Sequence, residues 1–247
     1  MPTVARCFLG WLNYQRVGVG MEVKGKSDLG QRLLYEGARE RPEHVMFWKG
    51  TDINRFWMAP KTNRFCRTDC AENLKRTEVV RLARQVYTFT PKILLRQTAD
   101  HPIATLDTKG VWIGRSVLAI LPTEGASHNI RYFLGLLNST YFEYMYNRLA
   151  SEKGRVIAQV KFAKLKQLPV RMIDQDDESD RQFHDRMVVL VDQMLALHNS
   201  LAAVKTDHDK TALQRQLDAT DKQIDQLVYQ LYGLTDDEIR IVEEATV

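Results

Sequence analysis

Basic side chains alternate with aromatic and amide side chains in several segments of this sequence. Arginine and lysine neutralise phosphates and can bind the major-groove edge of guanine, whereas glutamine and asparagine suit adenine. The pattern predicts a surface that binds nucleic acid. Eight side chains are candidates for DNA contact: Lys49, Arg55, Arg96, Gln97, Lys153, Arg155, Lys161 and Lys164.

The candidates fall into two groups by their predicted positions. Lys153, Arg155, Lys161 and Lys164 stand beside a glycine or alternate with other residues, as suits contact with the DNA backbone. Arg96 and Gln97 end a predicted strand, where their forked side chains could reach base edges. The alternative for these two is structural, since residues at a strand end can bond to the protein core.

The motifs of a DNA amino-methyltransferase are absent from the sequence. Such an enzyme needs Asn, Asp or Ser before Pro-Pro and an aromatic residue, yet none of the 7 prolines are adjacent. A glycine loop for the methyl donor should open a helix, and no helical pattern follows Gly18-Val19-Gly20. We therefore expect no catalysis and no cofactor from this chain alone.

Metal-dependent chemistry has little support. Glu22-Val23-Lys24 resembles half of a nuclease site, but no acidic residue precedes it, and a surface strand explains it better. Cys66 and Cys70 have a metal-like spacing without a second close pair, although His44 or His101 could be distant partners. We expect two ordinary thiols and no metal.

Charge is divided unevenly along the chain. Residues 1–172 carry 28 Lys and Arg against 14 Asp and Glu, a net charge of +14, whereas residues 173–247 carry 7 against 17, a net of −10. Such asymmetry suggests that the first part binds a polyanion and that the second does not. A basic surface kept for solubility is the alternative. The 3 cysteines and the lack of a long apolar run or a signal sequence indicate a cytoplasmic protein without a membrane span.

The first half of the sequence has the pattern of short strands and loops. Residues 45–58 form two apolar pieces around a turn at 49–52, and residues 92–97 form a strand. Residues 102–106 and 111–121 flank the turn Asp107-Thr108-Lys109-Gly110, which predicts a hairpin between them. After Gly154, residues 156–172 predict a short strand, a short helix and an exit at Pro169.

The second half is helical in pattern. Residues 128–149 predict a helix with Ser127 as N-cap, divided at Asn138-Ser139. An acidic run, 174–180, is the candidate domain boundary.

Beyond that boundary, apolar residues at alternating steps of 3 and 4 form two seams, at 187–204 and 213–231. We expect two helices joined near Lys205 to Lys210, a stop at Gly233 and a capping box from Thr235 to Glu238. The seams serve either internal packing or association with a partner helix.

Several ordered blocks resemble the TaqI-like C-terminal specificity domain of adenine methyltransferases, fused type IIG restriction–modification enzymes and BREX phage-defence methyltransferases. The resemblance extends over roughly residues 45–247, and the end of the chain is also similar to type I specificity subunits. The blocks are Lys49–Phe56, Pro91–Asp100, Ala104–Asp107, Tyr132–Ser139, Ser151–Gly154, Gln159–Lys161, Leu165–Val170, Ala219–Tyr229 and Leu231–Asp236.

The resemblance implies a target-recognition domain that docks on double-stranded DNA and presents an adenine to a separate catalytic domain. We expect an α+β fold with a strand-rich DNA target-recognition domain at 1–172 and a helical docking or dimerisation region at 173–247. The expected partners are DNA, a methyltransferase or restriction subunit or domain, and a second copy through the C-terminal helices. The alternatives are a protein- or RNA-interaction module acting through its helical tail, and a nuclease whose site is not recognised.

We predict that the isolated chain binds no S-adenosylmethionine, because it lacks both the Pro-Pro-aromatic motif and a donor-binding loop. Calorimetric titration of the pure protein with the methyl donor should give only heats of dilution. A saturable binding isotherm would contradict this prediction.

Overall fold

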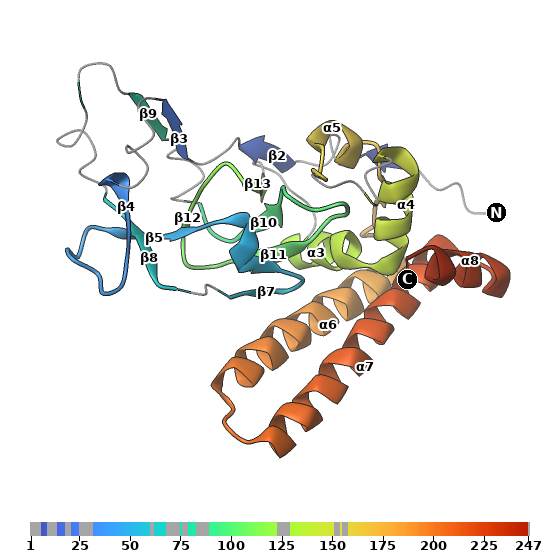
Figure 1. Cartoon of the computed structure of the whole chain (residues 1–247). Coiled ribbons are helices and arrows are strands. Elements are labelled where there is room, and N and C mark those ends of the chain that lie inside the picture. Colours follow the sequence, from blue (N-terminus) through green and yellow to red (C-terminus); the bar gives the residue numbers. More distant parts are fainter. Residues whose placement is uncertain are drawn as a thin grey trace.

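The computed structural model describes residues 6–8, 14–17, 21–24, 32–59, 62–67, 75, 79–82, 89–122, 129–150, 154 and 158–246. Short strands fill the first part: β1 (Arg6–Phe8), β2 (Tyr14–Val17), β3 (Met21–Lys24), β4 (Leu34–Glu36), β5 (Val45–Trp48), β6 (Ile53–Asn54), β7 (Trp57–Met58), β8 (Arg64–Cys66), β9 (Val79–Leu82), β10 (Lys92–Arg96), β11 (Ala104–Asp107), β12 (Trp112–Ile113) and β13 (Val117–Pro122). A 3-10 turn, η1 (Gly50–Asp52), follows β5. The remaining elements are α3 (Ile130–Asn138), α4 (Thr140–Ala150), α5 (Phe162–Leu165), β14 (Pro169–Arg171), α6 (Glu178–Ala203), α7 (Asp207–Tyr232) and α8 (Asp236–Thr246). The predicted α+β class is confirmed (Figure 1).

The central sheet has the strand order β11-β10-β13-β2, and each pair is antiparallel. Strand β10 is buried on both faces. Ile93 and Leu95 pack into the core shared with the helices, whereas Leu94 packs into a second cluster with Trp48 and Ile113. A strand covered on both faces needs a continuous apolar run. This explains why Ile93, Leu94 and Leu95 are consecutive.

The predicted hairpin between 102–106 and 111–121 is wrong. Strands β11 and β13 both pair with β10, which lies between them, and β12 leaves this sheet to run parallel to β5 in a second sheet, β12-β5-β8-β4. Asp107 is the physical reason. Its carboxylate accepts the backbone N–H groups of Lys109, Gly110 and Val111 at 2.8–3.1 Å, which turns the chain away from a return beside β11.

The same carboxylate forms a buried ion pair with β10. Lys92 Nζ lies 2.5 Å from Asp107 Oδ2, and both side chains are 0% exposed. Lys92 also donates to the Phe89 carbonyl at 3.2 Å. A buried charge is tolerated only when it is paired and hydrogen-bonded. The pair therefore fixes the register of β10 against β11.

Helices α3 and α4 divide at Asn138 and Ser139, as predicted. The N-cap of α3 is Asn129 and not Ser127, because the Asn129 side chain accepts the backbone N–H of Arg131 at 3.0 Å. Gly135 of α3 lies against α6, where an added Cβ atom would lie 2.3 Å from Met187 Sδ. Glycine thus permits a close approach between α3 and α6.

The two predicted seams form a helical hairpin, with α6 and α7 side by side in Figure 1. Gly233 ends α7 with φ 65°, and Thr235 and Glu238 form the capping box, in which the Thr235 N–H donates to Glu238 Oε2 at 2.8 Å. Seam residues Leu197 and Leu227 are 9% and 4% exposed and belong to the core shared with α3. The seams therefore pack within the chain; association through them stays a prediction.

The acidic run 174–180 is hydrogen-bonded to the strand-rich part of the chain. Asp180 is buried and accepts from Arg171 Nη2 at 2.6 Å and from the Asp174 N–H at 3.0 Å. The Arg171 guanidinium also donates to the Leu231 carbonyl at 2.7 Å. One hydrophobic core continues across residue 172 into the hairpin. In the part of the chain that the structure describes, no helix has the length and apolarity needed to span a bilayer.

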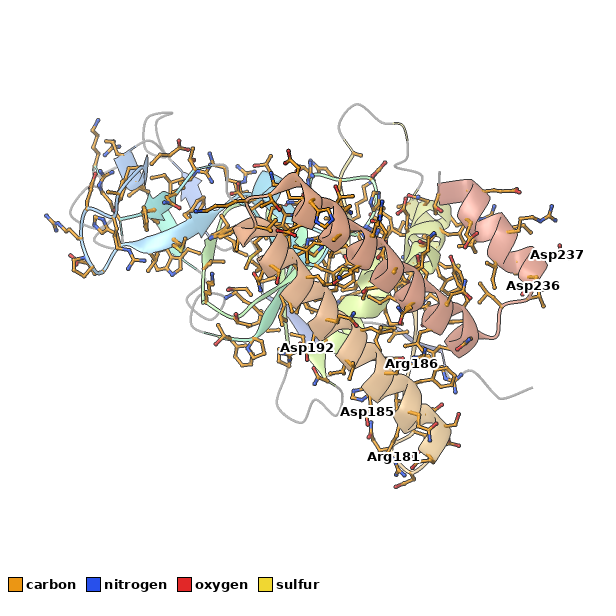
Figure 2. All side chains as sticks on the ribbon, turned by 90° about the horizontal axis from the view of Figure 1, so that it is seen from below. Arg181, Asp185, Arg186, Asp192, Asp236 and Asp237 are labelled. Atoms are coloured by element: carbon orange, nitrogen blue, oxygen red, sulfur yellow. The ribbon has the colours of Figure 1, made fainter. Side chains whose placement is uncertain are left out.

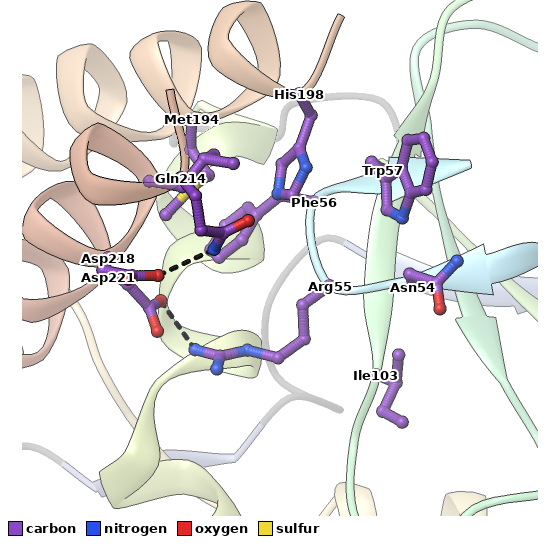
Figure 3. A pocket seen from close by; sticks show the side chains of 11 residues that line it. Asn54, Arg55, Phe56, Trp57, Ile103, Met194, His198, Gln214, Asp218 and Asp221 are labelled. Carbon is purple, nitrogen blue, oxygen red and sulfur yellow. Dashed lines mark hydrogen bonds and ion pairs between the residues drawn. The ribbon is translucent and has the colours of Figure 1, made fainter. Parts of the chain in front are cut away.

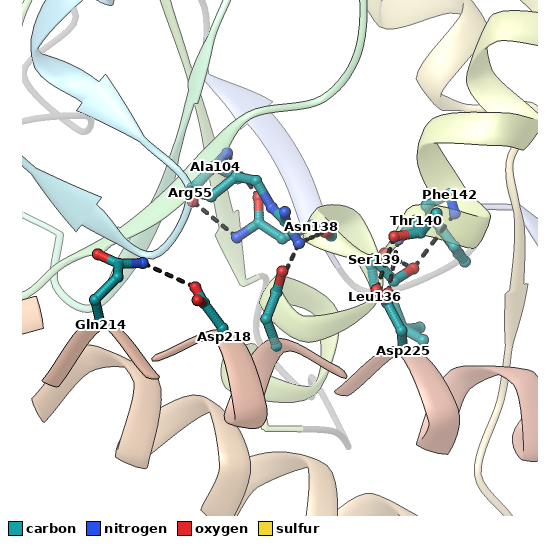
Figure 4. A network of polar contacts seen from close by, with 11 residues as sticks. Arg55, Ala104, Leu136, Asn138, Ser139, Thr140, Phe142, Gln214, Asp218 and Asp225 are labelled. Atoms are coloured by element: carbon teal, nitrogen blue, oxygen red, sulfur yellow. Dashed lines mark hydrogen bonds and ion pairs between the residues drawn. The ribbon is translucent and has the colours of Figure 1, made fainter. Parts of the chain in front are cut away.

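Asn138 links the sheet to the helices (Figure 4). Its buried side chain donates to the Ala104 carbonyl and accepts the Ala104 N–H, both at 2.9 Å. The Ala104 carbonyl also accepts the Phe56 N–H at 2.9 Å. Next along the chain, the Thr140 N–H and hydroxyl donate to Asp225 of α7 at 2.8 and 2.7 Å.

We predict that Asn138→Ala lowers the free energy of unfolding by about 2–3 kcal/mol. The change leaves the buried Ala104 N–H without a partner and removes a second hydrogen bond. Chemical denaturation followed by circular dichroism measures the effect. Asn199→Ala, at an exposed position of α6, should change stability by less than about 0.5 kcal/mol. Equal effects of the two substitutions would contradict the role given to Asn138.

Candidate nucleic-acid interface

Three loops are joined to one another and to the residue after β10 by hydrogen bonds. The Gln97 N–H donates to the Ser116 carbonyl at 2.9 Å, and the Val160 N–H donates to the Gln97 carbonyl at 2.8 Å. The Gly50 N–H donates to Ser116 Oγ at 2.8 Å. Segments that are distant in sequence thus meet at one place, which we call the β10 junction: Lys49–Gly50, Arg96–Thr98, Gly114–Ser116 and Val160–Lys161.

The β10 junction depends on glycine at position 50. A Cβ atom there would lie 2.7 Å from the Ser116 carbonyl oxygen and 3.2 Å from Thr98 Oγ1. Real Cβ atoms do not approach backbone oxygen so closely, so any side chain would push the loops apart. Gly114 is similarly restricted, since its Cβ would lie 2.9 Å from the Phe47 ring.

Candidates from three sequence blocks meet at the junction. Lys49 is exposed, and its backbone N–H donates to Asp52 Oδ2 at 2.7 Å. Lys161 is exposed, and its backbone N–H donates to the Tyr146 hydroxyl at 2.7 Å. Lys164 follows in α5 and is half-buried.

Arg96 and Gln97 are half-buried at the strand end. Arg96 Nε donates to the Thr98 carbonyl at 2.9 Å, so its guanidinium is partly engaged. The backbone of Gln97 holds two of the loops, while its side-chain amide has no hydrogen bond to the residues that the structure describes. Lys153 and Arg155 lie outside the described residues.

Arg55 points toward helix α7 (Figure 3). Its Nη2 donates to Asp221 Oδ1 of α7 at 2.8 Å and to the Asn138 carbonyl at 2.6 Å. The side chains of Arg55 and Asp221 are 36% and 32% exposed. This guanidinium therefore ties the turn between β6 and β7 to the helical hairpin, and a contact of Arg55 with DNA stays a prediction.

A cleft of about 370 Å³ lies beside Arg55, between the β6–β7 turn and helices α6 and α7 (Figure 3). The Trp57 and His198 rings stack at its edge with centroids 5.8 Å apart. Burial, together with the charge of Arg55, lowers the pKa of His198. Burial raises the pKa of Asp221, although Arg55 opposes the shift. Among the described residues, no group of three His, Cys, Asp or Glu could hold a metal ion, and Cys70 lies outside them.

Sequence reasoning missed Arg115. Residues 111–121 have the pattern of one continuous strand, which would place Arg115 inside a sheet. In the structure β12 ends at Ile113 and β13 starts at Val117, so that Arg115 is exposed on a turn of the β10 junction. The dipeptide Gly114-Arg115 before Ser116 was the only local sign of this turn.

We predict that Arg55→Met lowers the free energy of unfolding at pH 7 by about 1 kcal/mol, since the ion pair with Asp221 is half-exposed and screened. Asp221 is charged only above its raised pKa. The stabilisation by Arg55 is therefore present at neutral pH and is lost as the pH falls through that pKa, at a higher pH than for an ordinary aspartate. Denaturation curves of both proteins between pH 7 and pH 4 test this. Arg215→Met, at an exposed position of α7, should show no such pH dependence; a pH-independent loss in Arg55→Met would count against the ion pair.

The chain is similar to one known protein family and to parts of two solved structures. The family model of the TaqI-like C-terminal specificity domain matches residues 45–170. The type IIL restriction–modification enzyme MmeI, solved in complex with DNA, is 14% identical with a TM-score of 0.53; the match covers 92% of this chain and 35% of MmeI. A chain of a type I restriction–modification system is 12% identical with a TM-score of 0.41, over 95% of this chain and 46% of that one.

The chain thus spans about a third of the length of MmeI, and at these identities the likeness is one of fold. No curated protein sequence matches it. The family match extends over half of the chain, from the start of β5 into β14, and includes every segment of the β10 junction. The protein belongs to the family of TaqI-like C-terminal specificity domains.

Proposed function

We propose that this protein recognises a specific sequence of double-stranded DNA, as the specificity domain or subunit of a restriction–modification adenine methyltransferase. The observation that carries the proposal is the β10 junction. Its loops bring Lys49, Gln97 and Lys161 together from distant parts of a chain that belongs to a specificity-domain family. A surface that combines exposed cations with an amide able to bond to base edges has both functions needed for site-specific binding.

The two functions are assigned to different side chains. Lys49, Lys161 and Lys164 neutralise phosphates and fix the protein on the duplex, as do Lys153 and Arg155 in our proposal. Gln97 and Arg96 contact base edges, because the strand end holds them close to a fixed backbone. The Gln97 amide, which has no hydrogen bond to the described residues, can form paired hydrogen bonds with adenine N6 and N7.

Charge supports an orientation of the protein on DNA. The exposed surface of the helical part carries many carboxylates, and Figure 2 shows Asp185 and Asp192 along α6 and Asp236 and Asp237 at the start of α8. Carboxylates repel the phosphate backbone. DNA would therefore approach the strand-rich part of the chain, and residues 173–247 remain available for a protein partner.

The proposed partner is a methyltransferase subunit or domain that supplies the catalytic site. Residues 173–247 would dock it through their outer faces, since the seam residues are used in the internal core. Val189 on α6 and Ile241 on α8 are large apolar side chains that are 63% and 51% exposed. A second copy of this chain is the other occupant that these faces could accept.

We predict that the full chain binds duplex DNA with strong salt dependence. Each neutralised phosphate releases counterions, so that about six contacts give a slope near −5 in log affinity against log salt concentration. Fluorescence anisotropy with labelled duplexes between 50 and 300 mM salt, with single- and double-stranded RNA as competitors, measures this. No binding to duplex at low salt, with or without the methyltransferase partner, would end the proposal, and preferential displacement by RNA would replace it with RNA binding.

Single substitutions should separate the two functions. Lys161→Ala or Lys164→Ala should weaken binding to all sequences alike and reduce the slope by about 1. Gln97→Ala should cost about 1–3 kcal/mol on the preferred site and little on random DNA. Lys222→Ala, at an exposed position of α7, is the matched control and should change neither value. A folded Gln97→Ala variant with full site preference would remove Gln97 from the readout.

A further inference from the structure

We propose that Arg115 is a specificity-determining residue, which binds the major-groove edge of a guanine base. This inference rests on the proposed function, because it assumes that the β10 junction faces duplex DNA. It adds a residue outside the sequence-derived set and states the base that this residue selects.

The backbone on both sides of Arg115 is fixed. On one side the Gly114 N–H donates to the Trp48 carbonyl at 3.2 Å, and on the other the Ser116 carbonyl and hydroxyl accept from Gln97 and Gly50. The Val117 N–H donates to the Gly114 carbonyl at 3.1 Å and closes the turn. Arg115 is thus the one residue of this turn whose side chain is exposed to solvent.

The guanidinium of Arg115 is available. In the described part of the chain, no hydrogen bond or ion pair engages it. Other arginines differ in this respect: Arg64 pairs with the buried Asp52 at 3.0 Å, and Arg171 pairs with Asp180 at 2.6 Å. An arginine on a rigid turn without an internal partner is suited to an external ligand, because binding breaks no contact within the protein.

Rigidity favours a base over a phosphate as that ligand. A phosphate contact needs only a positive charge near the backbone, which flexible lysines such as Lys49 and Lys161 supply. The planar fork of arginine matches the O6 and N7 acceptors of guanine. Ser116, the residue after Arg115, accepts the backbone N–H of Gln97, so the two segments lie side by side. A guanine contact by Arg115 and an adenine contact by Gln97 would therefore fall on neighbouring base pairs.

The first experiment is selection of binding sites from a random duplex library with the full chain, in the presence of its methyltransferase partner where one is encoded beside it. We expect the wild-type protein to select a motif that contains a guanine, and Arg115→Ala to select the same motif without that base. On the wild-type motif, Arg115→Ala should bind about 5- to 150-fold more weakly. Arg115→Lys should keep the salt slope of the wild-type protein and discriminate less strongly at that base, because an ammonium group lacks the planar fork that donates to O6 and N7 together.

The second experiment replaces the implicated guanine by 7-deazaguanine, which lacks the N7 acceptor. The wild-type protein should lose affinity, whereas Arg115→Ala should be insensitive to the replacement. Lys109→Ala is the matched control: Lys109 is an exposed cation in the turn after β11, at the opposite end of β10, and its loss should leave the motif unchanged. Circular dichroism verifies that each variant is folded.

The outcomes are distinguishable. Failure of the wild-type protein to select any motif would overturn the proposed function and this inference with it. Selection of one unchanged motif by wild type and Arg115→Ala would overturn the inference alone. A uniform loss of affinity in Arg115→Ala with all bases retained would identify Arg115 as a phosphate contact and would also overturn the guanine assignment.

Discussion

The buried amide of Asn138 is the interaction on which the connection between sheet and helices depends. The amide forms hydrogen bonds with both the N–H and the carbonyl of Ala104. Ala104 lies on the outer edge of β11, where no neighbouring strand among the described residues is available to bond to these groups. This side chain belongs to the last residue of α3. Helix α4 then starts at Thr140 with its N-terminus on the carboxylate of Asp225, a favourable arrangement for the helix dipole. Asn138 and Thr140 therefore join the sheet and the hairpin, respectively, to the junction between α3 and α4.

Inside the strand-rich part, strand β10 connects two hydrophobic clusters. One face contributes to the core shared with the helices, and the other contributes to the cluster around Trp48. Its beginning is held by the Lys92–Asp107 ion pair, and its end holds the loops of the β10 junction. A strand buried on both faces and fixed at both ends has little freedom to move, so it is a suitable support for side chains that must meet a rigid ligand.

Sequence predicted the features whose causes are local. The stop at Gly233 and the capping box at Thr235 need only a few neighbouring residues, and the structure has both. Pairing in the sheet was predicted wrongly, because β11 and β13 both pair with β10, which precedes them in the chain, and a local turn pattern does not reveal such a partner. Asn129 lies two residues after Ser127, and either type can cap a helix, so the sequence did not distinguish them.

The candidate site also shows what local sequence cannot predict. The segments that carry Lys49, Gln97 and Lys161 are joined by hydrogen bonds, although the sequence could state only that these residue types suit contact with DNA. Arg55 is also of such a type, yet the turn that carries it faces Asp221 of α7. Which way a surface arginine points depends on tertiary neighbours. The exposed position of Arg115 depends in turn on where β12 ends.

The close contact between Gly50 and Ser116 has a consequence for how specificity can change during evolution. The loops of the β10 junction are joined through backbone groups, glycine and one serine hydroxyl, and not through the side chains at positions 96, 97 and 115. Replacement of those side chains therefore alters the chemistry that is offered to a ligand while the scaffold keeps its shape. If those side chains contact DNA as we propose, a fixed framework with exchangeable contacts would allow one fold to acquire new targets by single substitutions, without an intermediate that fails to fold.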